Sequence, residues 1–324
     1  MKSKKVLRLG TRASALALTQ SRTVARLLER AHKNLRVELI EISTTGDRVT
    51  GQSLASFGGA GVFVKELEAA LLDKRVDFAV HSLKDVPTQQ PKGLLIAAIS
   101  PREDPRDALV SRGNVPLEQM PRGSVIGSGS PRRRMQLKAR FPQLEFAEIR
   151  GNVDTRLRKV DEGRYAGTIL ALAGLKRLGL HARASAILPF DLMLPAPGQG
   201  ALGLECRAAD RATRRFLNAL HDAETAACVN AERALLEALG GGCHLPLGTL
   251  GEMAAKKSRS GGTPAALRLR AVLGHPDGSY FLSHERTGSP KSAKKLGAAL
   301  GQDLLNLGGK ELIARLREEG MAGV

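Results

Sequence analysis

Two adjacent arginines stand where a helix should begin. Ser130 is a typical N-cap residue and Pro131 a typical first helical residue, so Arg132 and Arg133 fall in the first turn, beside backbone N–H groups without helical partners. Positive charge there opposes the helix dipole, a cost that is explained if an anion is bound. The other interpretation is a solvated surface pair, for which lysine would serve as well. The pattern favours an anion-binding site.

Arginines recur at two other turns of this kind. Arg150 ends a predicted strand, Asn152 can cap the next helix, and Arg156 lies one turn further on. Arg12 follows the first predicted strand, just before the cap residue Ser14. Because α/β sheets bind ligands at the carboxyl ends of their strands, these side chains should serve one ligand crevice. Guanidinium groups bind carboxylates and phosphates alike, so the pattern predicts an anion without identifying it.

A lysine and a carboxylate follow the predicted strand VDFAVH. Lys84 and Asp85 lie in the stretch HSLKDVP, directly after that strand. An aspartate near several arginines could stabilise a cationic intermediate or move protons, whereas the alternative is an ordinary polar turn. His81 is expected to be structural, because no nucleophile at a suitable spacing accompanies it. The fragment alone leaves both interpretations of Asp85 open.

One cysteine lies in an unusual setting. Three glycines precede Cys243 in GGGCHLP and should end the preceding helix, leaving this cysteine on an exposed loop. Cys206 and Cys228 lie in apolar patterns and are expected in the core. Cys243 follows the negative end of its helix, so the dipole should not activate its thiol. If Cys243 reacts, its partner must be a strong electrophile.

The elements that position these residues alternate along the first 200 residues, as in a parallel α/β architecture. One helical run carries the apolar stripe Phe63, Leu67, Ala70 and Leu71. Beyond Asp222, a long helix, a hairpin joined by HPDGS and two final helices predict α+β character. The expected strands of the α/β part are KVLRLG, RVELIEIST, VDFAVH, SVIG, LEFAEI and TILALA.

Proline-rich stretches suggest where domains end. SPREDPRDA and LPAPGQG resemble crossings between domains, and 324 residues are too many for one ordinary core. The expected fold class is therefore α/β, with two α/β domains and a small C-terminal α+β domain. The expected boundaries are residues 1–100 with 200–218 for the first domain, 101–199 for the second and 219–324 for the third.

The composition limits the classes of function. Lys and Arg number 50 against 32 Asp and Glu, and the net charge of +18 should attract an anionic ligand. Nucleic acid is a weak candidate, because the absence of Trp and the presence of only two Tyr leave few stacking platforms. Three widely spaced cysteines suggest no disulfide framework, and no apolar run approaches the span of a bilayer. A cytoplasmic protein is expected.

Ten stretches occur in the order found in porphobilinogen deaminases. They are TRASALALTQ, STTGD, GVFVKELEAALL, HSLKDVP, REDPRDA, IRGNVDTRLRK, AGLKRLGL, GQGALGLECR, ETAACVNAERA and GGGCHLP. One short match would be weak, whereas ten in order are specific. The chain therefore resembles the porphobilinogen deaminase, or hydroxymethylbilane synthase, family over almost its whole length.

The resemblance implies that the first two domains are like type II periplasmic binding proteins, with the active cleft between them. It implies a transferase that removes ammonia from four porphobilinogen molecules and joins them head to tail on a dipyrromethane cofactor, releasing hydroxymethylbilane. It implies no metal. We also expect a monomer that hands its product to uroporphyrinogen III synthase, with no obligatory nucleic acid and no membrane.

The resemblance also implies roles for single residues. Cys243 looks like the attachment cysteine, forming a thioether to dipyrromethane, since an azafulvene is electrophilic enough to capture a neutral thiol. Asp85 matches the catalytic aspartate, which is expected to stabilise positive charge on the pyrrole nitrogens. The implied cofactor ligands are Lys84, Ser130, Arg132 and Arg133. The implied substrate ligands are Arg12, Ser14, Gln20, Phe63, Arg150, Arg156, Arg177 and Gln199.

The chain departs from the family pattern in a few places. Gly129 and Pro131 replace a serine and a leucine, Ala60 stands where bacterial relatives often carry lysine, and residues 254–264 look like an insertion. Two other classes of function are alternatives. A binding protein without catalysis would need neither Cys243 nor Asp85, and RNA binding through the basic surface would be an added activity.

Overall fold

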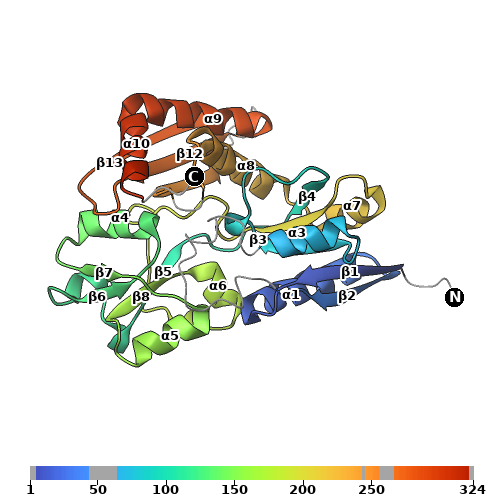
Figure 1. Cartoon of the computed structure of the whole chain (residues 1–324), viewed down its shortest axis with the longest axis horizontal. Helices are drawn as coiled ribbons and strands as arrows, with labels where there is room; N and C mark the ends of the chain where they lie inside the picture. Colours follow the sequence, from blue (N-terminus) through green and yellow to red (C-terminus); the bar gives the residue numbers. More distant parts are fainter. Residues whose placement is uncertain (1–4, 44–63, 243–244, 255–265, 321–324) are drawn as a thin grey trace, which may run out of the picture. The chain divides into compact units, whose positions relative to one another are not determined.

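The computed structural model describes residues 5–43, 64–242, 245–254 and 266–320. The chain forms two compact units (Figure 1). One comprises Met1–Glu103 and Ala201–Ala226, and the other comprises Asp104–Gly200 and Ala227–Val324. Two of the three crossings between them fall in the proline-rich stretches, and the third falls within the helix Ala223–Ala238. Division of the chain into three domains at the boundaries given above stays a prediction.

The first unit is built on a five-stranded sheet of order β2-β1-β3-β10-β4. β1 is parallel to β2 and β3, and β10 runs antiparallel to β3 and β4. The chain thus returns, after residue 200, to complete its first sheet. The elements are β1 (Lys5–Thr11), α1 (Ala15–Ala31), β2 (Leu35–Glu41), α3 (Lys65–Leu72), β3 (Phe78–Ser82), β4 (Leu94–Ile99), β10 (Leu202–Arg207) and α7 (Arg211–Leu217).

Helices cover both faces of this sheet. Phe78 and Val80 of β3 join the apolar cluster that includes Leu28 of α1, whereas Ala79 joins the cluster that includes Leu71 of α3. Successive strand residues point to opposite faces, so α1 and α3 lie on opposite sides. This burial on both faces explains why the strands read as nearly continuous apolar runs.

The second unit contains a similar five-stranded sheet of order β7-β6-β8-β5-β9. β6 is parallel to β7 and β8, and β5 runs antiparallel to β8 and β9. The elements are β5 (Asp107–Ser111), β6 (Val125–Gly127), α4 (Pro131–Arg140), β7 (Glu145–Ala147), α5 (Val153–Asp161), β8 (Gly167–Ala171), α6 (Leu172–Arg177) and β9 (Ala186–Ile187).

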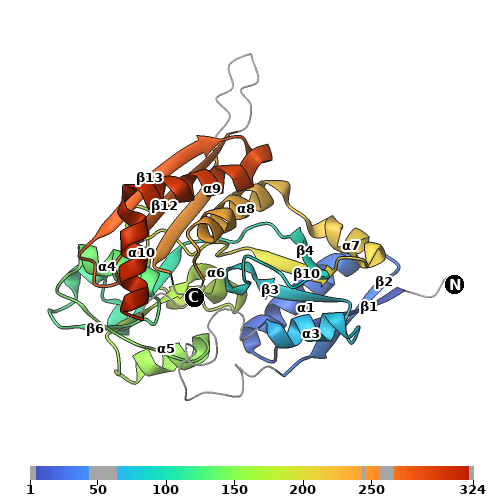
Figure 2. The same cartoon turned by 45° about the horizontal axis from the view of Figure 1, so that its top comes forward.

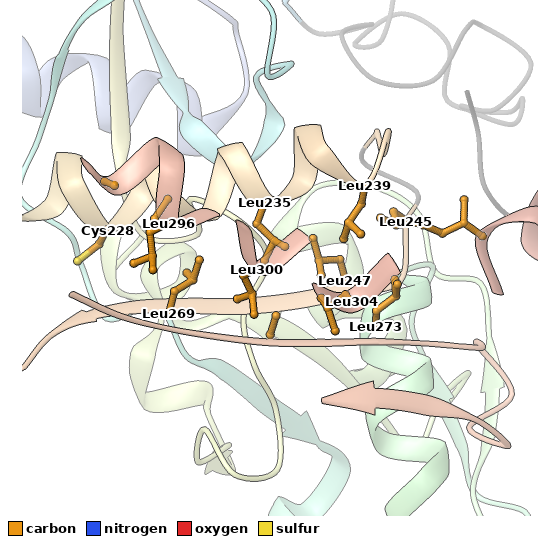
Figure 3. Packing of buried hydrophobic residues seen from close by; sticks show 14 of the residues in the cluster. Cys228, Leu235, Leu239, Leu245, Leu247, Leu269, Leu273, Leu296, Leu300 and Leu304 are labelled. Atoms are coloured by element: carbon orange, nitrogen blue, oxygen red, sulfur yellow. The ribbon is translucent and has the colours of Figure 1, made fainter. Parts of the chain in front are cut away.

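A separate antiparallel sheet, β11-β12-β13, forms the C-terminal part of the second unit. Leucines of its strands and helices pack into one apolar core, as Figure 3 shows. Figure 2 shows α9 lying along β12 and β13. The elements are α8 (Ala223–Ala238), which begins in the first unit, β11 (Leu247–Met253), β12 (Leu267–Gly274), β13 (Phe281–Gly288), α9 (Ala293–Leu304) and α10 (Lys310–Glu318).

Glycine allows α8 and α9 to approach closely. A side chain at Gly297 of α9 would place its Cβ 2.1 Å from the carbonyl oxygen of Ala231 in α8. Real Cβ atoms do not come so close to backbone atoms. The packing of the two helices therefore requires a glycine at position 297.

The expected fold class is confirmed, because two α/β sheets and a small C-terminal sheet with helices are all present. Ser14 caps α1, accepting a hydrogen bond from the N–H of Ala17 at 3.4 Å. Ser130 and Asn152 occupy the N-cap positions of α4 and α5, but in this described part of the chain neither side chain makes the capping hydrogen bond. Phe63, in the stripe assigned to α3, lies outside the described residues.

HPDGS joins β12 to β13 in an antiparallel hairpin, as predicted. Along the described ranges, no helix combines the length and the apolar character that a membrane crossing requires.

Candidate active site

The first unit gathers three of the predicted site residues at one edge of its sheet. β1 and β3 are parallel, so their carboxyl ends lie at the same edge. Arg12 follows β1, whereas Lys84 and Asp85 form a 3-10 turn, Leu83–Asp85, directly after β3. Arg12 and Lys84 are partly buried, and the Asp85 side chain is exposed. A carboxylate and two cations therefore lie at one sheet edge.

Gln20 ties this edge to the first helix. Its side chain is buried, and its amide donates to the hydroxyl of Ser82, at the end of β3, over 2.9 Å. The next residue, Ser21, donates to the hydroxyl of Thr11 over 2.8 Å. The amide of Gln20 thus holds α1 against the strand that leads to Asp85.

A buried glutamate of β10 contacts His81 of β3. His81 Nε2 is 3.0 Å from Oε2 of Glu205, which is completely buried. Burial, followed by the charge of Glu205, raises the pKa of Glu68. The position of His81 agrees with the structural role expected for it, since both its ring and its partner lie inside the unit.

The second unit brings together the paired arginines of α4. Arg132 and Arg133 are almost completely buried, and both donate to the carboxylate of Asp107 over 2.7 Å. Burial alone would raise the pKa of Asp107, but the charges of the two guanidinium groups overcome it and hold this pKa far below its ordinary value. The surface interpretation of the two arginines is therefore wrong, and an internal carboxylate is one anion that they bind.

Gln199 joins the same group of charges. Its amide donates to Asp107 Oδ1 over 3.1 Å and to the carbonyl oxygen of Pro105 over 2.6 Å, and its side chain is fully buried. Nearby in the sequence, Gly200 accepts a hydrogen bond from Arg177 Nη2 over 2.6 Å. The stretch LPAPGQG is thus held to α6 and β5 by predicted site residues.

Arg150 and Arg156 flank the turn from β7 to α5, and both are partly buried. Arg150 pairs with Glu148 at 2.7 Å, and Arg156 Nε donates to the carbonyl oxygen of Gly151 over 2.8 Å. Since β6, β7 and β8 are parallel, the turns that carry Ser130 and these two arginines lie at one sheet edge. Ser130 itself is partly buried.

Two of the three cysteines are core residues, as predicted. Cys206 lies in the core of the first unit, where burial first and then the charge of Asp210 raise the pKa of its thiol to about 11. Cys228 packs among leucines of the C-terminal core (Figure 3). Neither position has room for a large group without disrupting a core. Cys243 lies outside the described residues, but the preceding helix does end at glycines, with Gly240 at a φ of +62°.

Asp107 was missed from the sequence. It stands in REDPRDA, where it looked like one more charge of a domain crossing. The signal that could have revealed it is the arginine pair itself, because two buried cations at a helix start need a counter-ion within the fold. Only the pairing of β5 with β8 shows that Asp107 supplies it.

A cavity of about 440 Å³ lies elsewhere in the second unit, lined by Phe190, Arg268 and Arg270 among others. Its cations are paired within the protein, Arg268 with Glu285 at 2.5 Å and Arg270 with Glu252 at 3.0 Å. Of the predicted site residues that the structure describes, none lines it. This cavity is therefore not the candidate site.

Two family models match the chain. "Porphobilinogen deaminase, dipyromethane cofactor binding domain" matches residues 7–215, and "Porphobilinogen deaminase, C-terminal domain" matches residues 226–306. The chain belongs to the porphobilinogen deaminase family. As a member of this family, it is a transferase of tetrapyrrole biosynthesis that makes hydroxymethylbilane from porphobilinogen, and its cofactor is dipyrromethane.

Three solved structures resemble the chain weakly. The methionine-binding protein MetQ is 11% identical, with a TM-score of 0.43 over 66% of this chain and 89% of that one. A VFT2 domain of Bordetella pertussis BvgS is 15% identical, with a TM-score of 0.41 over 66% and 86%. The sulphonate-binding protein SsuA of Escherichia coli is 12% identical, with a TM-score of 0.38 over 72% and 70%. Scores this low add nothing to the assignment by family.

The residues of the second unit fit a carboxylated cofactor. Arg132, Arg133 and Asp107 together carry one net positive charge inside the protein. Arg133 Nε is buried and has no hydrogen-bond partner among the described residues. A buried donor without a partner is costly, and a carboxylate of dipyrromethane would have the charge and the acceptor atoms to satisfy it.

Proposed function

We propose that this chain assembles its tetrapyrrole on a dipyrromethane held by a thioether to Cys243, with Asp85 as the catalytic carboxylate. The observation that carries the proposal is the buried pair of arginines with one net positive charge at the sheet edge of the second unit. When bound, the dipyrromethane supplies the pyrrole position from which the chain is extended. The protein's own residues bind carboxylates, orient the rings and move protons.

Arg132 and Arg133, with Lys84 and Ser130, are the proposed ligands of the cofactor. The two arginines are rigidly placed, because each donates both to Asp107 and to a backbone carbonyl, that of Leu194 or Ile169. Guanidinium groups held in this way lose little conformational entropy when they bind a carboxylate.

Asp85 is the proposed catalytic residue because it combines exposure with a fixed backbone. Its 3-10 turn follows directly from β3, and the hydrogen bond of Gln20 to Ser82 fixes that end of the strand. An exposed carboxylate at such a position can stabilise positive charge on a pyrrole nitrogen and hold a proton in transit.

The acetate and propionate groups of each porphobilinogen require further cations. Partly buried arginines at the sheet edges are suited to this, because they combine charge with restricted motion. Gln20 and Gln199 are buried and hydrogen-bonded inside the protein, so we propose that they support the ligand groups around them. The proposed substrate ligands remain Arg12, Ser14, Gln20, Phe63, Arg150, Arg156, Arg177 and Gln199.

The proposal extends to the setting of the enzyme. We expect it to act as a monomer in the cytoplasm and to hand its product to uroporphyrinogen III synthase. The odd number of cysteines, two of them buried in apolar cores, supports a reducing compartment.

The mass of the purified protein tests the attachment. Protein from cells able to supply porphobilinogen should be heavier than its sequence by one dipyrromethane, and Cys243→Ala should lose this mass completely. Cys206→Ala and Cys228→Ala are matched controls that should keep it, because both thiols are buried in apolar cores. A wild-type protein without added mass would contradict the proposed cofactor chemistry, and loss of the mass in a control variant would move the attachment to that cysteine.

A further inference from the structure

A fully buried carboxylate organises the two arginines assigned to the cofactor. Asp107 is the first residue of β5 and has no solvent exposure. Its Oδ2 accepts from Arg132 Nη1 and its Oδ1 from Arg133 Nη2, both over 2.7 Å, and Oδ1 also accepts from Gln199 over 3.1 Å. Three side chains, two from α4 and one from the stretch LPAPGQG, thus meet on one carboxylate.

The position of Asp107 follows from the sheet. β5 is antiparallel to β8, and Asp107 pairs with Ala171, the last residue of β8. The start of β5 therefore lies at the edge where the parallel strands β6 and β8 end and α4 begins. Asp107 sits on a strand, so its carboxylate is fixed more firmly than a loop residue would allow.

The charges of Asp107, Arg132 and Arg133 do not balance. One carboxylate faces two guanidinium groups, and Arg133 Nε has no hydrogen-bond partner among the described residues. A group that served only to hold the fold together would be expected to satisfy its buried charges. The excess of one positive charge indicates that an anion completes the group.

We propose that Asp107 is a positioning residue, which holds Arg132 and Arg133 in place before the cofactor is attached. The proposal rests on the proposed function of those two arginines. The negative charge of Asp107 balances one of the two guanidinium charges, so that both arginines can be buried at the start of the helix. The remaining positive charge can attract a carboxylate of the cofactor. The arginines are then already ordered and do not lose further conformational entropy when the cofactor binds.

Chemical modification of the apoprotein tests the order of events. Wild-type protein from cells that cannot make porphobilinogen is treated with phenylglyoxal, and modified arginines are identified by peptide mass. Arg132 and Arg133 should react at least tenfold more slowly than Arg134, which is exposed on the same helix. If all three react at one rate without the cofactor, the arginines are not held in advance and the proposal fails.

Variants test the role of the carboxylate. Asp107→Asn keeps the shape but removes the charge, and Asp107→Asn with Arg133→Gln restores the original net charge. Both apoproteins should attach dipyrromethane from added porphobilinogen at least tenfold more slowly than wild type. Loading at the wild-type rate by either folded variant would overturn the proposal, and if neither folds, the modification experiment decides.

The control is a nearby carboxylate with a partner of its own. Asp104 pairs with Arg106 at 2.6 Å and is partly exposed, so Asp104→Asn should load within about twofold of wild type. Absence of dipyrromethane from wild-type protein would instead count against the proposed function. Failure of that function is thereby distinguished from failure of the role assigned to Asp107.

Discussion

Two aspartates of this chain show how environment separates roles at the scale of single residues. Asp85 is exposed at the end of a short turn, whereas Asp107 is fully buried between two guanidinium groups. The first is accessible to a ligand, and we propose it as the catalytic carboxylate. The second stays ionised because its neighbours hold its pKa far below the ordinary value, so it can only organise charge.

Asp85→Asn should leave the fold intact and slow turnover severely. An exposed side chain contributes little to stability, so the free energy of unfolding should change by no more than about 0.5 kcal/mol. Loss of a charge that stabilises the transition state should lower kcat by roughly 10²-fold or more. Hydroxymethylbilane formation by the purified variant measures this.

Asp73→Asn is a matched control for that substitution. Asp73 is also an exposed carboxylate of the first unit, 66% accessible and 3.8 Å from Arg75. Its turnover should equal that of the wild type. Near-normal turnover by Asp85→Asn would remove this aspartate from the mechanism.

Sequence reasoning at this scale succeeded where a residue's own type was informative. The pair Arg132 and Arg133 stood out because cations are unfavourable at a helix start. Asp107 did not stand out, because an aspartate in a charged, proline-rich stretch has many ordinary explanations. Its partners lie 25 and 26 residues away in the chain, and only the pairing of strands brings them together.

At the scale of elements, the contact between α8 and α9 predicts that replacing a helical glycine by alanine lowers the free energy of unfolding, contrary to the usual effect. Gly297→Ala should stabilise an isolated helix by roughly 1 kcal/mol, because alanine is the better helix former. Here the new Cβ would meet the carbonyl oxygen of Ala231, so we expect a net loss of about 1–3 kcal/mol instead. Thermal unfolding of the variant shows whether it is less or more stable than the wild type.

The control for this contact is Ala298→Ser, an exposed change of small size on the same helix. Its unfolding midpoint should differ little from that of the wild type. A more stable Gly297→Ala variant would show that α8 and α9 can move apart at little cost.

A second prediction at this scale concerns the end of α10. His275 follows β12 and bonds Asp277 through Nδ1 and Glu319 through Nε2, both at 2.7 Å, while Glu319 also bonds Arg315. Burial alone would lower the pKa of His275, but hydrogen bonds to Glu319 and Asp277 and their charges raise it above 6.5. Protonated His275 therefore joins the hairpin to the last helix.

The raised pKa fixes how stability should depend on pH. The contribution of His275 is fully present below pH 6.5 and is lost as the pH rises through the higher pKa of the folded protein. Wild type should exceed His275→Gln by about 3–6 °C in unfolding midpoint near pH 6, and the gap should shrink by pH 9. A gap that is constant over this range would mean that the charge of His275 does not act.

Elements were the level best predicted from the sequence. Strands, helices and the HPDGS hairpin follow from periodicity and turn residues, which are local properties. The failures concern both elements and bonds, because β4, β5, β9 and β10 were not among the expected strands. Ser130 and Asn152 stand at their N-cap positions, yet within the described chain neither makes the capping bond, since a side chain's partner depends on its surroundings.

At the scale of the whole molecule, the net charge of +18 should act on a substrate with two carboxylates. Salt screens such attraction beyond about 10 Å at 0.1 M. Raising the salt from about 0.05 to 0.5 M should therefore increase KM for porphobilinogen about threefold or more, with kcat nearly unchanged. Initial rates at several salt concentrations measure both constants.

Sodium chloride and potassium chloride at equal ionic strength serve as the control, because screening does not depend on which of the two salts supplies it. A KM that is independent of salt would restrict the role of charge to the arginines in direct contact with the substrate.

The sequence by itself determined the family, the alternation of strands and helices, and the residue types that could bind a carboxylated ligand. These properties are carried by short stretches and by local periodicity, which need no knowledge of distant contacts. Only the tertiary structure decided that Asp107 lies between Arg132 and Arg133, that Gln20 holds the end of β3, and that a missing side chain lets α8 meet α9. Each of these contacts joins segments far apart in the chain, where burial and strand pairing, rather than local preference, set the geometry.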